Sequence, residues 1–183
     1  MPHHTPVVAP RDPITFAALY RRYVTPIYRY AYSRVGNQAD AEDIAAQVFS
    51  EALAGLDRYR EEGNFAAWLF TIAARRIVDH YRQAKPHLPL DAACFLSADG
   101  RSPLNQAIHN EKLAELARLV AQLPAEKQEL LRLRFAGELT YAEIGAVVGR
   151  SEAATKMALN RLLRQLEREM TAVSKVGDLD EQS

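Results

Sequence analysis

The sequence has few of the residues on which covalent scaffolds and metal-based scaffolds depend. It contains a single cysteine, Cys94, so a disulfide framework and a cysteine-based zinc site are both excluded. Glycine is scarce, with 8 residues in 183, and aromatic residues make up only 8 %. That composition disfavours a sandwich or barrel built from many short strands and turns. These absences favour an all-α fold in a reducing compartment.

Long hydrophobic runs and an excess of one charge are also missing. No segment offers the roughly 18 consecutive apolar residues of a membrane helix, and the first thirteen residues lack the apolar run of a signal peptide. We therefore expect a cytoplasmic protein without membrane insertion. The 23 Lys and Arg residues balance 23 Asp and Glu residues, unlike the composition of strongly basic proteins that coat nucleic acid. If the chain binds DNA, its positive charge must be local, or a partner must supply affinity.

Sequence patterns of catalysis are absent as well. There is no glycine-rich phosphate loop and no HExxH motif. The histidines are scattered along the chain, at His3, His4, His80, His87 and His109. We expect a protein that is not an enzyme and that holds no cofactor and no metal ion.

The periodicity of the apolar residues divides the chain into two helical blocks. Residues 1–13 contain four prolines and are expected to form a disordered arm. Apolar residues recur at spacings of three and four through residues 14–84 and again through 105–171, which predicts two all-α domains. Residues 85–104 contain prolines and no sustained period, so they predict a flexible linker, and residues 172–183 a flexible tail. We expect the two small helical domains to be independent of each other.

Two local features of the first block give expectations about its helices. Pro26 lies inside a helical stripe and should kink or divide that helix, because proline lacks a backbone donor. The pair Gly36-Asn37 should end the helix, and Asp40 can then cap the next one.

The second block contains the pattern of a helix-turn-helix. Thr140 and Glu143 form a capping box, in which each side chain satisfies a free amide at a helix start. Gly149 can take the positive φ of a tight turn, Gly145 is small where two helices must cross, and Ser151 can cap the second helix. This unit is known to place its second helix in the major groove of DNA. The sequence therefore predicts a DNA-binding domain.

The second helix of this unit carries the predicted DNA contacts. Residues near its start are polar and can reach base edges, and cations further along suit phosphate groups. The predicted contacts are made by Arg150, Ser151, Thr155, Lys156, Arg161 and Arg164. Residues 105–171 nevertheless carry ten Lys or Arg and nine Asp or Glu, a net charge of only +1. Such a domain should bind DNA poorly alone, because phosphate neutralisation supplies most non-specific affinity.

Taken together, the two blocks resemble the extracytoplasmic-function (ECF) class of bacterial sigma factors. The first block carries FAALYRRYVTPIYRYAYSRVGNQADAEDIAAQVFSEAL, similar to the family's first helices, and RYREEGNFAAWLFTIAARRIVDHYR, similar to its promoter-melting segment. The second block carries LPAEKQELLRLRFAGELTYAEIGAVVGRSEAATKMALNRLLRQL, which is similar to the family's fourth region. The resemblance implies a transcription initiation factor that binds core RNA polymerase and promoter DNA. It also implies an anti-sigma factor as a partner.

The resemblance also implies roles for residues of the first block. A polar helix edge would dock on core polymerase through Asp40, Glu42, Asp43 and Gln47. A loop and the helix after it would capture and hold the melted −10 element through Tyr59, Arg60, Asn64, Arg75 and Arg76. A polar pocket with an aromatic wall can repay part of the cost of extruding a base.

This sequence departs from the family pattern in two places. Ala46 and Gln47 stand where the family usually has a glutamine and an acidic residue, which removes one expected ion pair with polymerase. In the recognition helix, Ala158 stands where an arginine is usual, within the run Ala153 to Ala158. Because a bidentate arginine–guanine contact discriminates between bases, we expect a different or weaker −35 preference.

Two other functions remain open at this point. The chain could be a stand-alone helix-turn-helix regulator whose first domain senses a ligand or dimerises. It could also be a helical adaptor that binds a partner protein and no DNA. A gel shift with and without core polymerase would separate all three.

Overall fold

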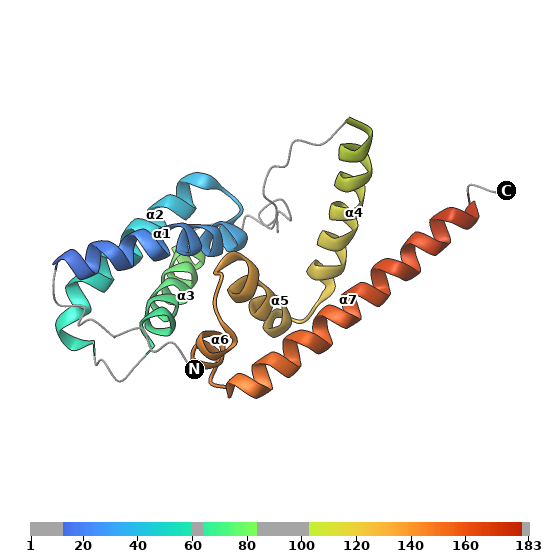
Figure 1. Cartoon of the computed structure of the whole chain (residues 1–183). Helices are drawn as coiled ribbons and strands as arrows, with labels where there is room; N and C mark the ends of the chain where they lie inside the picture. Colours follow the sequence, from blue (N-terminus) through green and yellow to red (C-terminus); the bar gives the residue numbers. More distant parts are fainter. Residues whose placement is uncertain (1–12, 60–63, 84–102, 181–183) are drawn as a thin grey trace.

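The computed structural model describes residues 13–59, 64–83 and 103–180, and every regular element among them is helical (Figure 1). The first unit consists of α1 (Pro13–Val35), α2 (Gln38–Gly55), the 3₁₀ turn η1 (Leu56–Arg58) and α3 (Phe65–Gln83). The second consists of α4 (Pro103–Gln122), α5 (Ala125–Leu131), the π-helical turn η3 (Arg132–Ala136), α6 (Tyr141–Val148) and α7 (Glu152–Asp180). The all-α fold with two helical units is confirmed.

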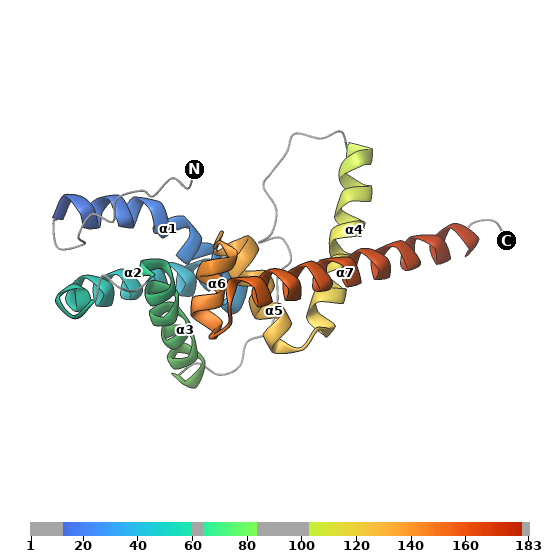
Figure 2. The same ribbon diagram turned by 60° about the horizontal axis from the view of Figure 1, so that its bottom comes forward.

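The predicted arm and linker fall almost entirely outside the described residues, apart from Pro13, which starts α1, and residues 103–104, which start α4. The C-terminal helix is longer than expected. Helix α7 continues to Asp180, through most of the predicted tail, and its second half projects away from the other helices in both views (Figures 1 and 2). No helix in the described part of the chain is long and apolar enough to cross a membrane.

The prediction that Asp40 caps α2 is wrong, and of the two effects expected of Pro26, a kink or a division, the division does not occur. Pro26 does not divide α1, which runs unbroken from Pro13 to Val35, because the helix is held by the core on either side of it: Tyr23 and Ile27 are both buried. Asp40 is not the N-cap of α2. Gly36, with a φ of +73°, follows the last residue of α1. The extended Asn37 is the N-cap of α2, because its side-chain Oδ1 accepts a hydrogen bond from the backbone amide of Asp40 at 2.9 Å.

The two units pack against each other and share one continuous apolar core. Helix α1 contacts η3, and α3 contacts α6. Phe70 on α3 lies so close to Gly137 that a Cβ atom there would be 2.7 Å from its ring. Val147 and Val148 of α6 pack against the same core. The expectation that the two domains are independent is therefore wrong for this arrangement, because each presents apolar side chains that the other covers.

Polar contacts also join the two units, and Glu129 of α5 is at their centre. Its carboxylate accepts the Tyr30 hydroxyl at 2.5 Å and the Arg34 guanidinium at 2.7 Å. Burial, and then the Glu129 charge, raises the pKa of Tyr30, so this hydroxyl stays protonated and donates. Arg132 is buried beside the same carboxylate, and burial lowers its pKa. Arg29 and Glu138 form a second, more exposed ion pair at 2.5 Å.

Candidate nucleic-acid interface

Helices α6 and α7 form the predicted helix-turn-helix, with its caps in place. Thr140 Oγ1 accepts the amide of Glu143 at 3.2 Å, and Glu143 accepts the amide of Thr140 at 2.7 Å, which completes the capping box. Gly149 takes φ +69° at the end of α6, and Ser151 Oγ accepts the amide of Ala154 at 3.2 Å at the start of α7. The turn predictions for these residues are confirmed.

The crossing of the two helices depends on Gly145 and Thr155. A Cβ atom on Gly145 would lie 2.5 Å from the carbonyl oxygen of Arg150 and 3.2 Å from Thr155 Oγ1. Thr155 is fully buried, and its hydroxyl donates to the Ser151 carbonyl at 3.0 Å. A buried hydroxyl that is already bonded to its own helix cannot reach a base edge. Thr155 therefore positions the recognition helix, and we leave it out of the interface.

The outer face of α7 carries exposed cations. Lys156, Arg161 and Arg164 are exposed and spaced along one side of the helix. Among the described residues, none of these three side chains forms an ion pair, so their charges are available to phosphate groups. At the turn, Arg150 is exposed and lies 3.2 Å from the exposed carboxylate of Glu126.

A shallow groove of about 640 Å³ runs along the same face of α7. It is lined by Met157, Asn160, Arg161, Arg164, Glu167 and Arg168. Met157 and Asn160 were not among the predicted contacts. Their spacing from Lys156 and Arg161 could have identified them, because residues three and four apart share a helix face.

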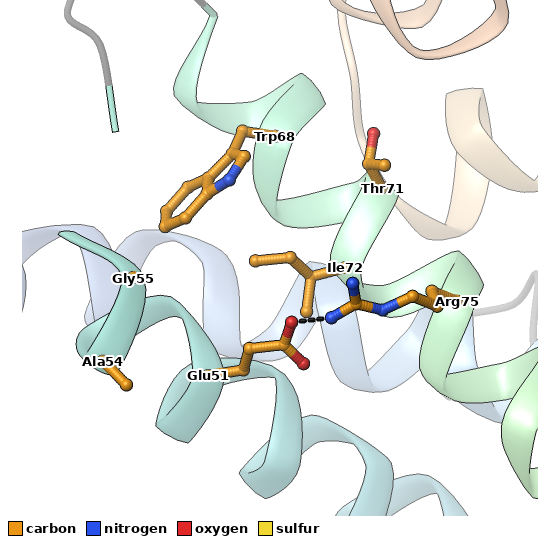
Figure 3. A pocket seen from close by; sticks show the side chains of 7 residues that line it. All are labelled: Glu51, Ala54, Gly55, Trp68, Thr71, Ile72 and Arg75. Atoms are coloured by element: carbon orange, nitrogen blue, oxygen red, sulfur yellow. Dashed lines mark ion pairs between the residues drawn. The ribbon is translucent and has the colours of Figure 1, made fainter. Parts of the chain in front are cut away.

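The two predicted −10 cations that the structure describes, Arg75 and Arg76, are in contrast already paired. Arg75 and Arg76 both bind Glu51 of α2, with Arg76 Nε at 2.8 Å and the Arg75 ion pair drawn in Figure 3. Glu51 was not predicted, since it lies 25 residues from Arg76 in sequence. Figure 3 shows Glu51 and Arg75 at one side of a pocket of about 420 Å³, with Trp68 at the other.

Of the predicted base-capture residues, Tyr59 follows η1 and Asn64 directly precedes α3. Asn64 is exposed, and its Oδ1 accepts the amide of Ala67 at 3.3 Å. The half-buried Tyr59 ring packs on Trp68 and Phe65, with centroids 5.0 and 5.5 Å apart. Arg60 lies outside the described residues. The structure therefore places the half-buried Tyr59 ring in an aromatic cluster with Phe65 and Trp68.

The predicted polymerase-binding residues share α2. Glu42, Asp43 and Gln47 are exposed. Asp40 is half-buried. Its carboxylate accepts a hydrogen bond from Asn37 Nδ2 at 2.6 Å and lies 3.2 Å from His80 Nε2 of α3. Three of the four side chains are thus available to a partner, and the fourth is held beside α3.

Comparison with known proteins matches both units to one family. Residues 19–86 match the model of sigma-70 region 2, and residues 113–166 match that of sigma-70 region 4. The chain is 35 % identical over 156 residues to the ECF RNA polymerase sigma factor BldN of Streptomyces coelicolor. That match covers 84 % of this chain and 59 % of BldN, so the chain spans less than two thirds of that relative's length.

A second relative is covered more fully. The ECF RNA polymerase sigma factor SigD of Mycobacterium tuberculosis is 32 % identical over 154 residues, covering 80 % of this chain and 72 % of SigD. The fold is similar to that of CnrH in its complex with the cytosolic domain of CnrY, with a TM-score of 0.60, 24 % identity, and coverage of 90 % and 92 %. The chain therefore belongs to the ECF family of RNA polymerase sigma factors.

Proposed function

We propose that this chain acts by binding core RNA polymerase and directing it to promoters, with α7 bound at the −35 element and the first unit holding the melted −10 element. Sigma factors are transcription initiation factors and not catalysts, so the proposal needs no cofactor. It places the protein in the cytoplasm with the polymerase and includes regulation by an anti-sigma factor. The observation that carries it is the exposed cationic face of α7, which forms no ion pair within the described part of the chain, in a helix-turn-helix whose caps are in place.

The contacts at the −35 element would divide along α7. Arg150 and Ser151 stand at the helix start, where a recognition helix meets base edges. Lys156, Arg161 and Arg164 follow on the exposed face and would bind phosphate groups of the DNA backbone. Since phosphate contacts fix the register of a protein on the duplex, these cations would hold the helix start over the bases.

At the −10 element, Tyr59 and Asn64 would hold an unstacked base, with Arg75 and Arg76 on the phosphates of the opened strand. Arg75 and Arg76 share the single carboxylate of Glu51, so one negative charge faces two positive ones. The excess positive charge favours an incoming phosphate. Binding would then exchange one ion pair for another, without exposing an unpaired charge.

The polymerase contact would be made by the exposed edge of α2. Glu42, Asp43 and Gln47 point away from the core, and their charge is suited to a basic surface. Asp40, which is held by Asn37 and His80, would contribute charge more than a direct hydrogen bond.

Binding both promoter elements at once would require the two units to separate. Helix α6 contacts α3 on one side and α7 on the other. Packed helices lie 8–10 Å apart, so the axes of α3 and α7 are within about 20 Å of each other. The −10 and −35 elements are about 25 base pairs apart, or about 85 Å of B-form DNA at 3.4 Å per pair. The contacts of Glu129 would therefore break when the promoter is bound.

The decisive experiment is run-off transcription with purified core polymerase on a promoter library. We expect transcripts from a defined promoter class only when both the chain and core are present. A gel shift on the same DNA separates the other readings. A stand-alone regulator would shift duplex DNA without core, and a helical adaptor would not shift DNA in either condition.

A further inference from the structure

The recognition helix exposes an apolar side chain where DNA readers usually place polar ones. Met157 is 64 % exposed, the largest exposure among the large hydrophobic residues of the described chain. It lies in the first two turns of α7, three residues after Ala154 and four after Ala153. Residues at these spacings share a helix face, and both alanines are exposed. The start of the proposed DNA-reading face therefore includes an apolar patch of Ala153, Ala154 and Met157 beside its polar residues.

This surface has a specific complement in the major groove. Among the base edges there, the only apolar group is the C5-methyl of thymine, and the other groups are hydrogen-bond donors and acceptors. Ala153, Ala154 and Met157 have no strong donor or acceptor in their side chains, and an unbranched thioether adapts to the shape it meets. Guanine or cytosine opposite this surface would lose water from polar groups and gain no hydrogen bond.

We propose that Met157, supported by Ala153, makes this factor select a thymine within the −35 element through its C5-methyl group. The proposal rests on the function proposed above and names the kind of site that α7 binds. Lys156 and Arg161 flank Met157 on the exposed face, so phosphate contacts on either side would press it into the groove.

The same helix offers a matched control. Leu163 is also exposed, at 37 %, but it lies six residues further on. At 3.6 residues per turn, six residues rotate the side chain to about 240° from Met157. Leu163 would therefore face away from the bases that Met157 meets. Replacing either residue by glutamine removes an exposed apolar group without opening the core.

The test uses the full chain with core polymerase and a duplex promoter library in which ten base pairs around the −35 position are random. Bound DNA is sequenced, and each enriched thymine is then replaced singly by deoxyuridine, which removes only the methyl group. We expect one position at which deoxyuridine weakens wild-type binding about fourfold, the factor for burying one methyl-sized group. Met157→Gln should bind thymine and deoxyuridine equally there, whereas Leu163→Gln should behave as wild type.

Three results would overturn the inference while leaving the proposed function intact. The first is that the sequenced bound DNA shows no position enriched in thymine. The second is that the wild-type chain binds DNA with thymine and DNA with deoxyuridine equally well. The third is that deoxyuridine still weakens binding by the Met157→Gln chain. Absence of any bound DNA would instead overturn the proposed function, and this inference with it. Circular dichroism of the glutamine variants, unchanged from wild type, makes loss of folding distinguishable from loss of the contact.

Discussion

Replacing Glu129 by alanine should separate the two helical units of the free chain. The substitution removes the acceptor of Tyr30 and Arg34 and leaves the buried Arg132 without its nearest carboxylate. Breaking a buried pair by removing one partner costs about 3–5 kcal/mol. Because the Glu129 and Arg34 side chains are 22 % and 26 % exposed, we expect less, about 2–3 kcal/mol. At 1.4 kcal/mol per factor of ten, this shifts the equilibrium toward separated units by about 30- to 150-fold.

Single-molecule energy transfer measures that equilibrium directly. Dyes would be attached through cysteines at the exposed positions Ser50 and Gln122, one on each unit, in a chain whose Cys94 is replaced by serine. The wild-type chain should give mainly the high-transfer state of the packed arrangement. The Glu129→Ala chain should populate a low-transfer state, while its helical circular dichroism stays unchanged.

Glu138→Ala provides the matched control, because it removes an ion pair between the same two units. The side chains of Arg29 and Glu138 are 41 % and 55 % exposed, and exposed pairs contribute about 0–1 kcal/mol. The reasoning is refuted if Glu129→Ala keeps the wild-type transfer distribution, or if Glu138→Ala opens the chain as much. A fall in helicity in Glu129→Ala would show that Glu129 stabilises its own unit and not the contact between the units.

Three further predictions concern the recognition helix and the melting loop. Lys156→Ala and Arg161→Ala should each weaken binding to the upstream promoter element while the fold stays intact. Each should also reduce the slope of log K for DNA binding against log salt concentration by about 1, the value for one lost phosphate contact. Unchanged footprints at several salt concentrations in both variants would remove this assignment. Tyr59→Ala combined with Asn64→Ala should recruit polymerase but open the promoter poorly, since stacking contributes about 1–3 kcal/mol per base. Permanganate reactivity of thymines near the start site, measured beside occupancy, tests this, and a parallel fall in both would indicate docking or folding instead. Gly145→Ala should lower the free energy of unfolding by about 1–3 kcal/mol through overpacking, because its Cβ would lie 2.5 Å from the Arg150 carbonyl oxygen. If the Gly145→Ala chain unfolds at the wild-type midpoint temperature, the close helix crossing at Gly145 is not required.

The helix-turn-helix could be predicted in detail because its determinants are local. A capping box joins residues three apart, and a positive φ depends on one glycine, so Thr140, Glu143 and Gly149 each specify their own geometry. The same local rules misled at Asp40 and Thr155. Asn37 was the better cap once Gly36 had ended α1, and Thr155 satisfies its hydroxyl within its own helix, so its polarity did not require exposure.

The contacts that the sequence could not predict are those between distant segments. Glu51 meets Arg76 across 25 residues, and Glu129 meets Tyr30 across 99. Apolar periodicity shows which face of a helix is buried but not which helix covers it. The two units therefore looked independent, although α3 and α6 cover each other.

The pairing of charges explains how a chain with no net charge can present the cationic face that we propose binds DNA. In the first unit, Arg75 and Arg76 are held by Glu51, and at the contact between the units Arg34 is held by Glu129. Acidic residues thus pair with these three arginines, whereas Lys156, Arg161 and Arg164 are exposed on α7 and form no ion pair among the described residues. Affinity for phosphate depends on the cations that reach it and not on the total charge. On the proposed function, a neutral chain with a few exposed cations would bind DNA weakly alone, and tethering by polymerase would make the contact effective.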